Sequence, residues 1–191
     1  MNDYLFNYPL LKSSSKVIEI TPKQGDEEIA LKRTYPNLFV KSLVFILSDF
    51  IPFFTRLQPL WCHFLLDMFQ VNLNITYNNQ TLHIRQSGDR TWDIIQNEKE
   101  VGFVLGKSSF SIDKEGAKEI VIDERVFIIA SSELGPDVEV FSENEKHVGT
   151  FKSDLYHLKD GVHSLRLLDP TASTYVPIII GYFYLNNYLQ C

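Results

Sequence analysis

The chain has 191 residues, of which 45% are hydrophobic, 13% aromatic and 22% charged. This composition predicts a single folded domain over residues 1–191 with a full core, and it excludes a disordered chain. The formal net charge of −6 argues against a general nucleic-acid binder, because such proteins present a surplus of Lys and Arg to phosphates.

Short alternating segments separated by turn residues recur along the chain. Alternation with a period of two places one face of each segment in a core, so these segments predict strands. They are typical of an antiparallel meander or barrel, and we expect a closed antiparallel β-barrel of about 12 strands, because closure removes exposed strand edges. The predicted strands are Tyr4–Leu10, Lys16–Ile20, Glu28–Thr34, Val71–Thr76, Thr81–Arg85, Thr91–Gln96, Val101–Leu105, Phe110–Ile112, Glu119–Ile122, Val126–Ala130, Val138–Ser142, Val148–Phe151 and Val162–Leu168.

Residues 36–69 break the alternation and predict a helical hairpin inserted between two strands. Apolar residues from Pro36 to about Ile51 fall on one helix face, and Thr34 is placed to cap that helix. From Leu57 onward, apolar residues repeat at helical spacing again. Charged residues interrupt the hairpin, so no uncharged run approaches the roughly 18 residues that a membrane-spanning helix needs.

The hairpin has alternative roles because its apolar side chains are bulky. It packs against the barrel or plugs one end of it, or it docks onto a membrane surface or a partner chain through the same side chains. Each role needs the same amphipathic pattern. The contact candidates for docking are Phe50, Phe53, Phe54, Trp61 and Phe64.

One six-residue motif occurs twice, at Asn97–Gly102 and at Asn144–Gly149. In each copy a predicted strand runs into a polar turn and returns through Val-Gly, where glycine permits a bulge or a close backbone approach. The repeat predicts two similar hairpins in one sheet, and the alternative is a shared binding role.

The segment Tyr175–Leu185 carries no charge and is apolar on all sides if it is helical. A helix of this kind must be buried on every side, which predicts a central helix threaded through the barrel. Thr174 is placed to cap it, and Pro177 falls in the first turn, where its missing N–H is tolerated. The alternative is a buried central strand, since Ile178–Ile180 are β-branched.

Motifs for catalysis or metal binding are absent from the sequence. The histidines are scattered, without Cys or carboxylate partners at zinc-ligand spacing. Cys62 precedes His63, but neighbours on a helix point about 100° apart and do not form a nucleophile and base pair. We therefore expect no enzyme activity, no metal and no cofactor. A small-molecule-binding or hydrolytic barrel is kept as a remote alternative.

The two cysteines, Cys62 and Cys191, form neither a CxxC pair nor a disulfide framework, which favours a reducing compartment. The first residues lack the basic stretch and apolar core of a signal peptide. We therefore expect a cytoplasmic protein.

Several segments resemble the tubby C-terminal-like family, in particular its members from Bacillus-type bacteria. The resemblance rests on Tyr4–Lys12, on Ile29–Asn37 with the helical run that follows, and on Trp92–Ile95 with the Val101-Gly102 return. It spans nearly the whole chain. It implies the threaded barrel that LURP-one-related proteins and phospholipid scramblases are thought to share.

The resemblance also implies a role at membranes. Eukaryotic tubby domains bind phosphoinositide head groups through basic residues on the barrel wall, and scramblases act at membranes. The nearest head-group candidates in this chain are Lys32, Arg33 and Lys41, and the alternative is that they form a solvated face. We therefore expect a non-catalytic binding module that binds anionic phospholipid at the cytoplasmic face of a membrane. The second hypothesis is a homo-oligomeric scaffold in which the hairpin forms the dimer contact.

Overall fold

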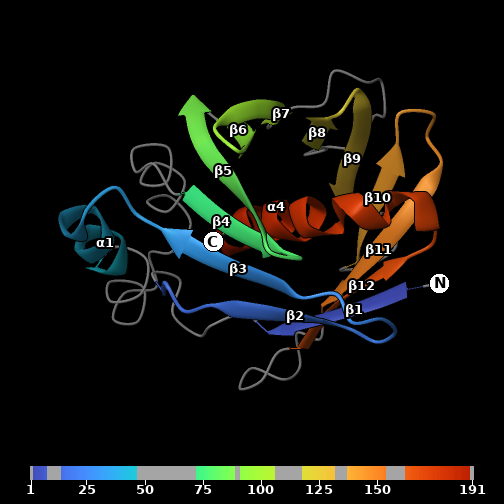
Figure 1. The fold of residues 1–191 in the computed structure, drawn as a ribbon, viewed down its shortest axis with the longest axis horizontal. Helices are drawn as coiled ribbons and strands as arrows, with labels where there is room; N and C mark the ends of the chain where they lie inside the picture. Colours follow the sequence, from blue (N-terminus) through green and yellow to red (C-terminus); the bar gives the residue numbers. More distant parts are fainter. Residues whose placement is uncertain are drawn as a thin grey trace.

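The structure, a computed structural model, describes residues 2–7, 14–46, 72–88, 91–105, 118–131, 137–153 and 162–189. Within these residues, twelve strands form one closed barrel in which strands adjacent in sequence pair antiparallel. The first strand pairs with the last and closes the barrel (Figure 1). The predicted fold class, a closed antiparallel barrel with a C-terminal helix, is confirmed.

The observed strands coincide with predicted segments to within a few residues at each end. They are β1 (Asn2–Asn7), β2 (Ile18–Pro22), β3 (Ile29–Thr34), β4 (Asn72–Tyr77), β5 (Gln80–Gly88), β6 (Thr91–Gln96), β7 (Lys99–Leu105), β8 (Lys118–Ile122), β9 (Arg125–Ser131), β10 (Val138–Ser142), β11 (His147–Ser153) and β12 (Val162–Leu167). The predicted strand Phe110–Ile112 lies outside the described residues.

Alternation along each strand decides which side chains fill the barrel. In β3, Ile29, Leu31 and Arg33 are buried, whereas Lys32 between them is exposed. Buried apolar residues from all twelve strands form one core cluster, and residues of the C-terminal helix lie in the same cluster.

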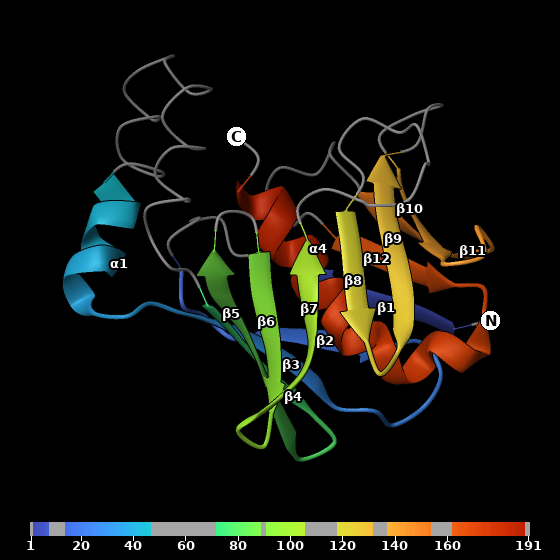
Figure 2. The same cartoon turned by 90° about the horizontal axis from the view of Figure 1, so that it is seen from above.

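The C-terminal helix occupies the centre of the barrel (Figure 2). A 3-10 turn, η2 (Pro170–Tyr175), leads directly into α4 (Val176–Leu189). Every residue from Val176 to Tyr184 is buried, as expected for a helix that is apolar around its whole circumference. The predicted central helix is confirmed, and the alternative of a central strand is wrong.

The start of this helical segment differs from the prediction. The carboxylate of Asp169 accepts a hydrogen bond from the Thr171 backbone N–H at 2.9 Å and so caps η2. Thr174 does not act as the cap, because it lies inside η2, a turn that the sequence pattern did not predict. Pro177 is the second residue of α4, where a missing N–H costs no intrahelical bond.

The connections alternate between the two ends of the barrel because successive strands are antiparallel. We call one end the turn end, since its five connections are short: residues 23–28, 78–79, 97–98, 123–124 and 143–146. At this end, both residues of the three two-residue connections have positive φ, as the hairpin turns that fit strand twist require. We call the opposite end the loop end, and its connections are 8–17, 35–71, 89–90, 106–117, 132–137 and 154–161.

Helix α4 runs from the turn end to the loop end (Figure 2). Near its start, the Thr171 carbonyl lies 3.5 Å from Nη1 of Arg125, a residue beside the β8–β9 turn. Near its end, the ring of Tyr184 lies against Arg33, which is next to the last residue of β3 and so lies toward the loop end. The two ends of the barrel therefore differ in both their connections and their contacts with α4.

The six-residue repeat forms two similar hairpins, as predicted. In β6–β7 the register shifts between Ile94 and Ile95, opposite Gly102. In β10–β11 the register shifts between Val140 and Phe141, opposite Gly149. Each copy thus has an irregularity beside the Val-Gly pair, where the absence of a glycine side chain allows close strand approach.

The described part of the predicted insertion contains helix α1 (Leu38–Phe45), which stands to one side of the strands (Figures 1 and 2). Its cap is Asn37, whose Oδ1 accepts a hydrogen bond from the Val40 N–H at 2.8 Å. Thr34 was the predicted cap, but it pairs with Asn72 at the end of β3 and so is not available. The rest of the predicted hairpin lies outside the described residues.

Candidate functional site

The barrel interior contains polar side chains toward the loop end. The Arg33 guanidinium lies 4.9 Å from the centre of the Tyr184 ring, and its Nη1 donates to the Tyr35 hydroxyl at 3.5 Å. Burial raises the pKa of the Tyr182 and Tyr184 hydroxyls, so both are neutral at physiological pH. These contacts hold Arg33 inside the fold through a cation–π interaction and a hydrogen bond.

The three predicted head-group residues occupy different environments. Lys32 is exposed on the outer face of β3, and Lys41 is partly exposed on α1. Arg33 is only 1% exposed, because alternation along β3 turns it to the same side as Ile29 and Leu31. The structure therefore leaves Lys32 and Lys41 accessible and places Arg33 in the barrel.

Helix α1 carries a surface that sequence reasoning did not identify. We define the α1 patch as its exposed large apolar residues, Leu38, Phe39, Phe45 and Ile46. Leu38 and Phe39 are 80% and 74% exposed. The available signal was Asn37: a cap at that position puts Leu38 and Phe39 in the first turn. The predicted contact residues Phe50, Phe53, Phe54, Trp61 and Phe64 lie outside the described residues.

The turn end carries an excess of acidic side chains. Its five connections hold two basic residues, Lys23 and Lys146, against eight acidic ones. The acidic residues are Asp26, Glu27, Glu28, Glu98, Asp123, Glu124, Glu143 and Glu145. In the described residues of the loop-end connections, Lys16 and Lys41 stand against one acidic residue, Asp137. Among the described residues of these connections, acidic side chains are thus concentrated at the turn end.

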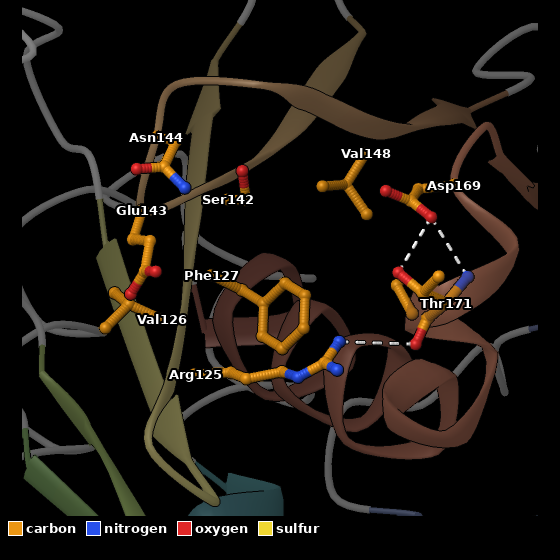
Figure 3. A pocket seen from close by; sticks show the side chains of 10 residues that line it. Arg125, Val126, Phe127, Ser142, Glu143, Asn144, Val148, Asp169 and Thr171 are labelled. Carbon is orange, nitrogen blue, oxygen red and sulfur yellow. Dashed lines mark hydrogen bonds between the residues drawn. The ribbon is translucent and has the colours of Figure 1, made fainter.

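A pocket of about 160 Å³ opens at the turn end, between the start of β9, the β10–β11 turn and η2 (Figure 3). Its apolar part comes from Phe127, Val148 and Ala172, which are buried. Its polar lining comes from Arg125, Ser142, Glu143, Asn144, Asp169 and Thr171. The pocket therefore combines an apolar floor with charged and hydrogen-bonding walls.

Two of the charged groups in the pocket already have partners. Asp169 accepts hydrogen bonds from Lys146 Nζ at 2.6 Å and from the N–H and Oγ1 of Thr171 at 2.9 and 2.8 Å. These donors lower the pKa of Asp169 to about 2, so it is a carboxylate at all ordinary pH values. Arg125 donates to the Thr171 carbonyl at 3.5 Å and lies 5.4 Å from the centre of the Tyr175 ring.

Glu143 differs from Asp169 because it is exposed at the pocket wall. Within the described part of the chain, no hydrogen bond or ion pair engages its carboxylate. Figure 3 shows Glu143 across the pocket from Thr171. It is the carboxylate that can bind a group entering the pocket.

The described residues contain no group of three His, Cys, Asp or Glu side chains placed to hold a metal ion. Among the described helices, none combines the length and hydrophobicity that crossing a bilayer requires. In comparisons with known proteins, no family model, curated protein or solved structure matches the chain.

Proposed function

We propose that this protein is a non-catalytic binding module of tubby-like type that docks onto an anionic phospholipid surface with the loop end of its barrel. The observation that carries the proposal is the α1 patch, where Leu38 and Phe39 are largely exposed close in sequence to Lys32 and Lys41. Apolar side chains of this size insert among acyl chains while neighbouring ammonium groups attract lipid phosphates.

The filled interior supports docking through an outer surface. The strands surround α4, whose residues from Val176 to Tyr184 are buried in the shared core. A ligand that entered the barrel centre would have to displace this helix and its apolar contacts. Binding at an end of the barrel requires no such rearrangement.

The charge distribution supports one orientation. An anionic membrane repels the acidic turn end and attracts Lys16, Lys32 and Lys41. Each basic residue near such a surface contributes about 1 kcal/mol. The proposed orientation therefore places the loop end against the lipid and the turn end away from it.

Flotation with vesicles tests the proposal. We expect the protein to float with phosphatidylserine-containing vesicles and not with purely phosphatidylcholine ones. Leu38→Asp/Phe39→Asp should reduce the floated fraction at least tenfold, since burying one such side chain is worth about 1.5–3 kcal/mol. Leu168→Asp is the matched control, because it makes the same change at an exposed turn-end residue. It should float like the wild type.

Two outcomes separate the hypotheses. If the wild type does not float with either lipid, the membrane proposal fails. If Leu38→Asp/Phe39→Asp only converts a dimer to a monomer in light scattering, the α1 patch is a self-association contact instead.

A further variant, Phe53→Asp/Trp61→Asp, tests the predicted contacts outside the described residues. It should float less than the wild type if the whole insertion contacts lipid.

A further inference from the structure

We infer that the turn-end pocket is a second binding site, which takes a cationic Arg or Lys side chain of a basic protein segment. The site lies at the opposite end of the barrel from the α1 patch (Figure 2). It is therefore independent of the proposed lipid contact and remains accessible when the loop end is occupied.

Charge complementarity identifies the class of partner. The turn-end connections carry eight acidic side chains and two basic ones, and one of the two basic residues, Lys146, is bonded to Asp169 at 2.6 Å. Such a surface raises the local concentration of cations and steers basic segments toward it. An acidic segment would be repelled by the same surface.

The pocket gives this surface a specific point of contact. Its buried floor, Phe127 with Val148 and Ala172, suits the methylene stem of a long side chain. The exposed Glu143 carboxylate at the wall suits the cationic head, because none of the described residues engages it in a hydrogen bond or ion pair and a charge-assisted hydrogen bond can form there. A pocket volume of about 160 Å³ is on the scale of one side chain rather than of a whole folded element.

The charged residues beside Glu143 differ in how they would act on a cationic ligand. Asp169 is a carboxylate, but Lys146 and Thr171 already donate three hydrogen bonds to its oxygens. Arg125 is a like charge for a cationic ligand, and its contacts with Thr171 and Tyr175 hold it on the η2 side of the pocket. Glu143 is therefore the residue that binds, and Arg125 opposes binding.

Titration with a short peptide tests the inference without lipid. The probe is an acetylated, amidated heptapeptide with two arginines, and its control has citrulline at both positions, which removes the charge but keeps the shape. In amide-detected NMR, the arginine peptide should shift the signals of residues 142–144, Asp169, Thr171 and Ala172. The citrulline peptide should not shift them.

Matched variants distinguish binding of the peptide in the pocket from general attraction by the acidic turn end. Glu143→Gln should weaken binding of the arginine peptide about tenfold, which corresponds to about 1.4 kcal/mol. Glu98→Gln removes the same charge from another turn at the same end and should change the affinity less than twofold. Arg125→Gln should tighten binding about two- to fivefold, because it removes the like charge.

The inference is overturned if no peptide binds, or if Glu143→Gln and Glu98→Gln weaken binding equally, which would show attraction by the turn end as a whole. Weaker binding by Arg125→Gln would also overturn it, since Arg125 would then contribute to binding the cationic side chain and not oppose it. Glu143 is exposed, so its substitution leaves the fold intact, and circular dichroism checks this for each variant.

Discussion

His163 is a titratable residue whose side chain is partly buried in the barrel. It lies in β12, with its ring stacked on Phe6 at a centroid distance of 5.7 Å. Burial lowers its pKa from 6.5 to about 4. The unfolded chain therefore takes up a proton first as the pH falls, and the stability due to neutral His163 is full above about pH 6.5 and lost between 6.5 and 4.

We expect the wild type to lose more stability than His163→Phe when the pH is lowered from 7 to 4.5. The full pKa shift would correspond to about 3 kcal/mol, but the side chain is partly exposed, so solvent screening reduces the expected difference to about 1–2 kcal/mol. The variant keeps a flat ring and removes the titration. Urea unfolding at both pH values measures the difference, and identical losses for the two proteins would contradict the role of His163.

Arg33 and Leu38 show what could be predicted for single residues. The alternation Ile29, Leu31, Arg33 places Arg33 inside the barrel, and this pattern is visible in the sequence. Its positive charge favoured a surface position instead, because the partners that stabilise it, Tyr35 and the distant Tyr184, meet it only in the fold. Leu38 was missed because a helix pattern does not reveal whether an apolar residue meets the core.

At the scale of elements, the two glycine-containing hairpins are the most specific local feature. An added Cβ at Gly102 would overlap the Val121 carbonyl oxygen and lie 2.9 Å from Ile122 Cα, both of which belong to the neighbouring strand. At Gly149 the closest atom would be the Arg166 carbonyl oxygen, at 2.9 Å. Backbone atoms cannot move aside as the end of a flexible side chain can, so a side chain here strains the sheet.

We expect Gly102→Ala to lower the free energy of unfolding by about 2–3 kcal/mol and Gly149→Ala by about 1–2 kcal/mol, within the range for overpacked sites. The ranking follows from the closer backbone contact at Gly102. Chemical denaturation of both variants measures the two costs. If Gly102→Ala left the free energy of unfolding unchanged, or if Gly149→Ala lowered it more than Gly102→Ala, the hairpins would not depend on this close approach.

Elements with strong periodicity could be predicted well. The strands alternate, so their type and approximate bounds follow from the sequence. The segment at Val176 is apolar on all sides, which favoured a buried helix but left a central strand as the alternative. The helix starts could not be predicted in the same way. Thr34 and Asn37 are both suitable caps, and strand pairing with Asn72 decides between them. At the C-terminal helix, the 3-10 turn shifts the cap to Asp169.

At the scale of the whole molecule, the barrel separates two surfaces of different chemistry. The loop end presents the α1 patch with Lys16 and Lys41, and the turn end presents acidic connections around a small pocket. Barrel topology produces this separation, because alternate connections must lie at opposite ends. The sequence contains both sets of residues, but their separation becomes visible only when the strand order is known.

The orientation on the membrane is the central claim, and depth-dependent quenching tests it most directly. In a chain with Cys62→Ser and Cys191→Ser, a fluorescent label is attached through Ser42→Cys on α1 or through Glu98→Cys at the turn end. The vesicles are anionic and carry nitroxide-labelled lipid. We predict strong quenching of the label at 42 and none beyond the aqueous background at 98. Equal quenching at both positions, or stronger quenching at 98, would contradict docking by the loop end.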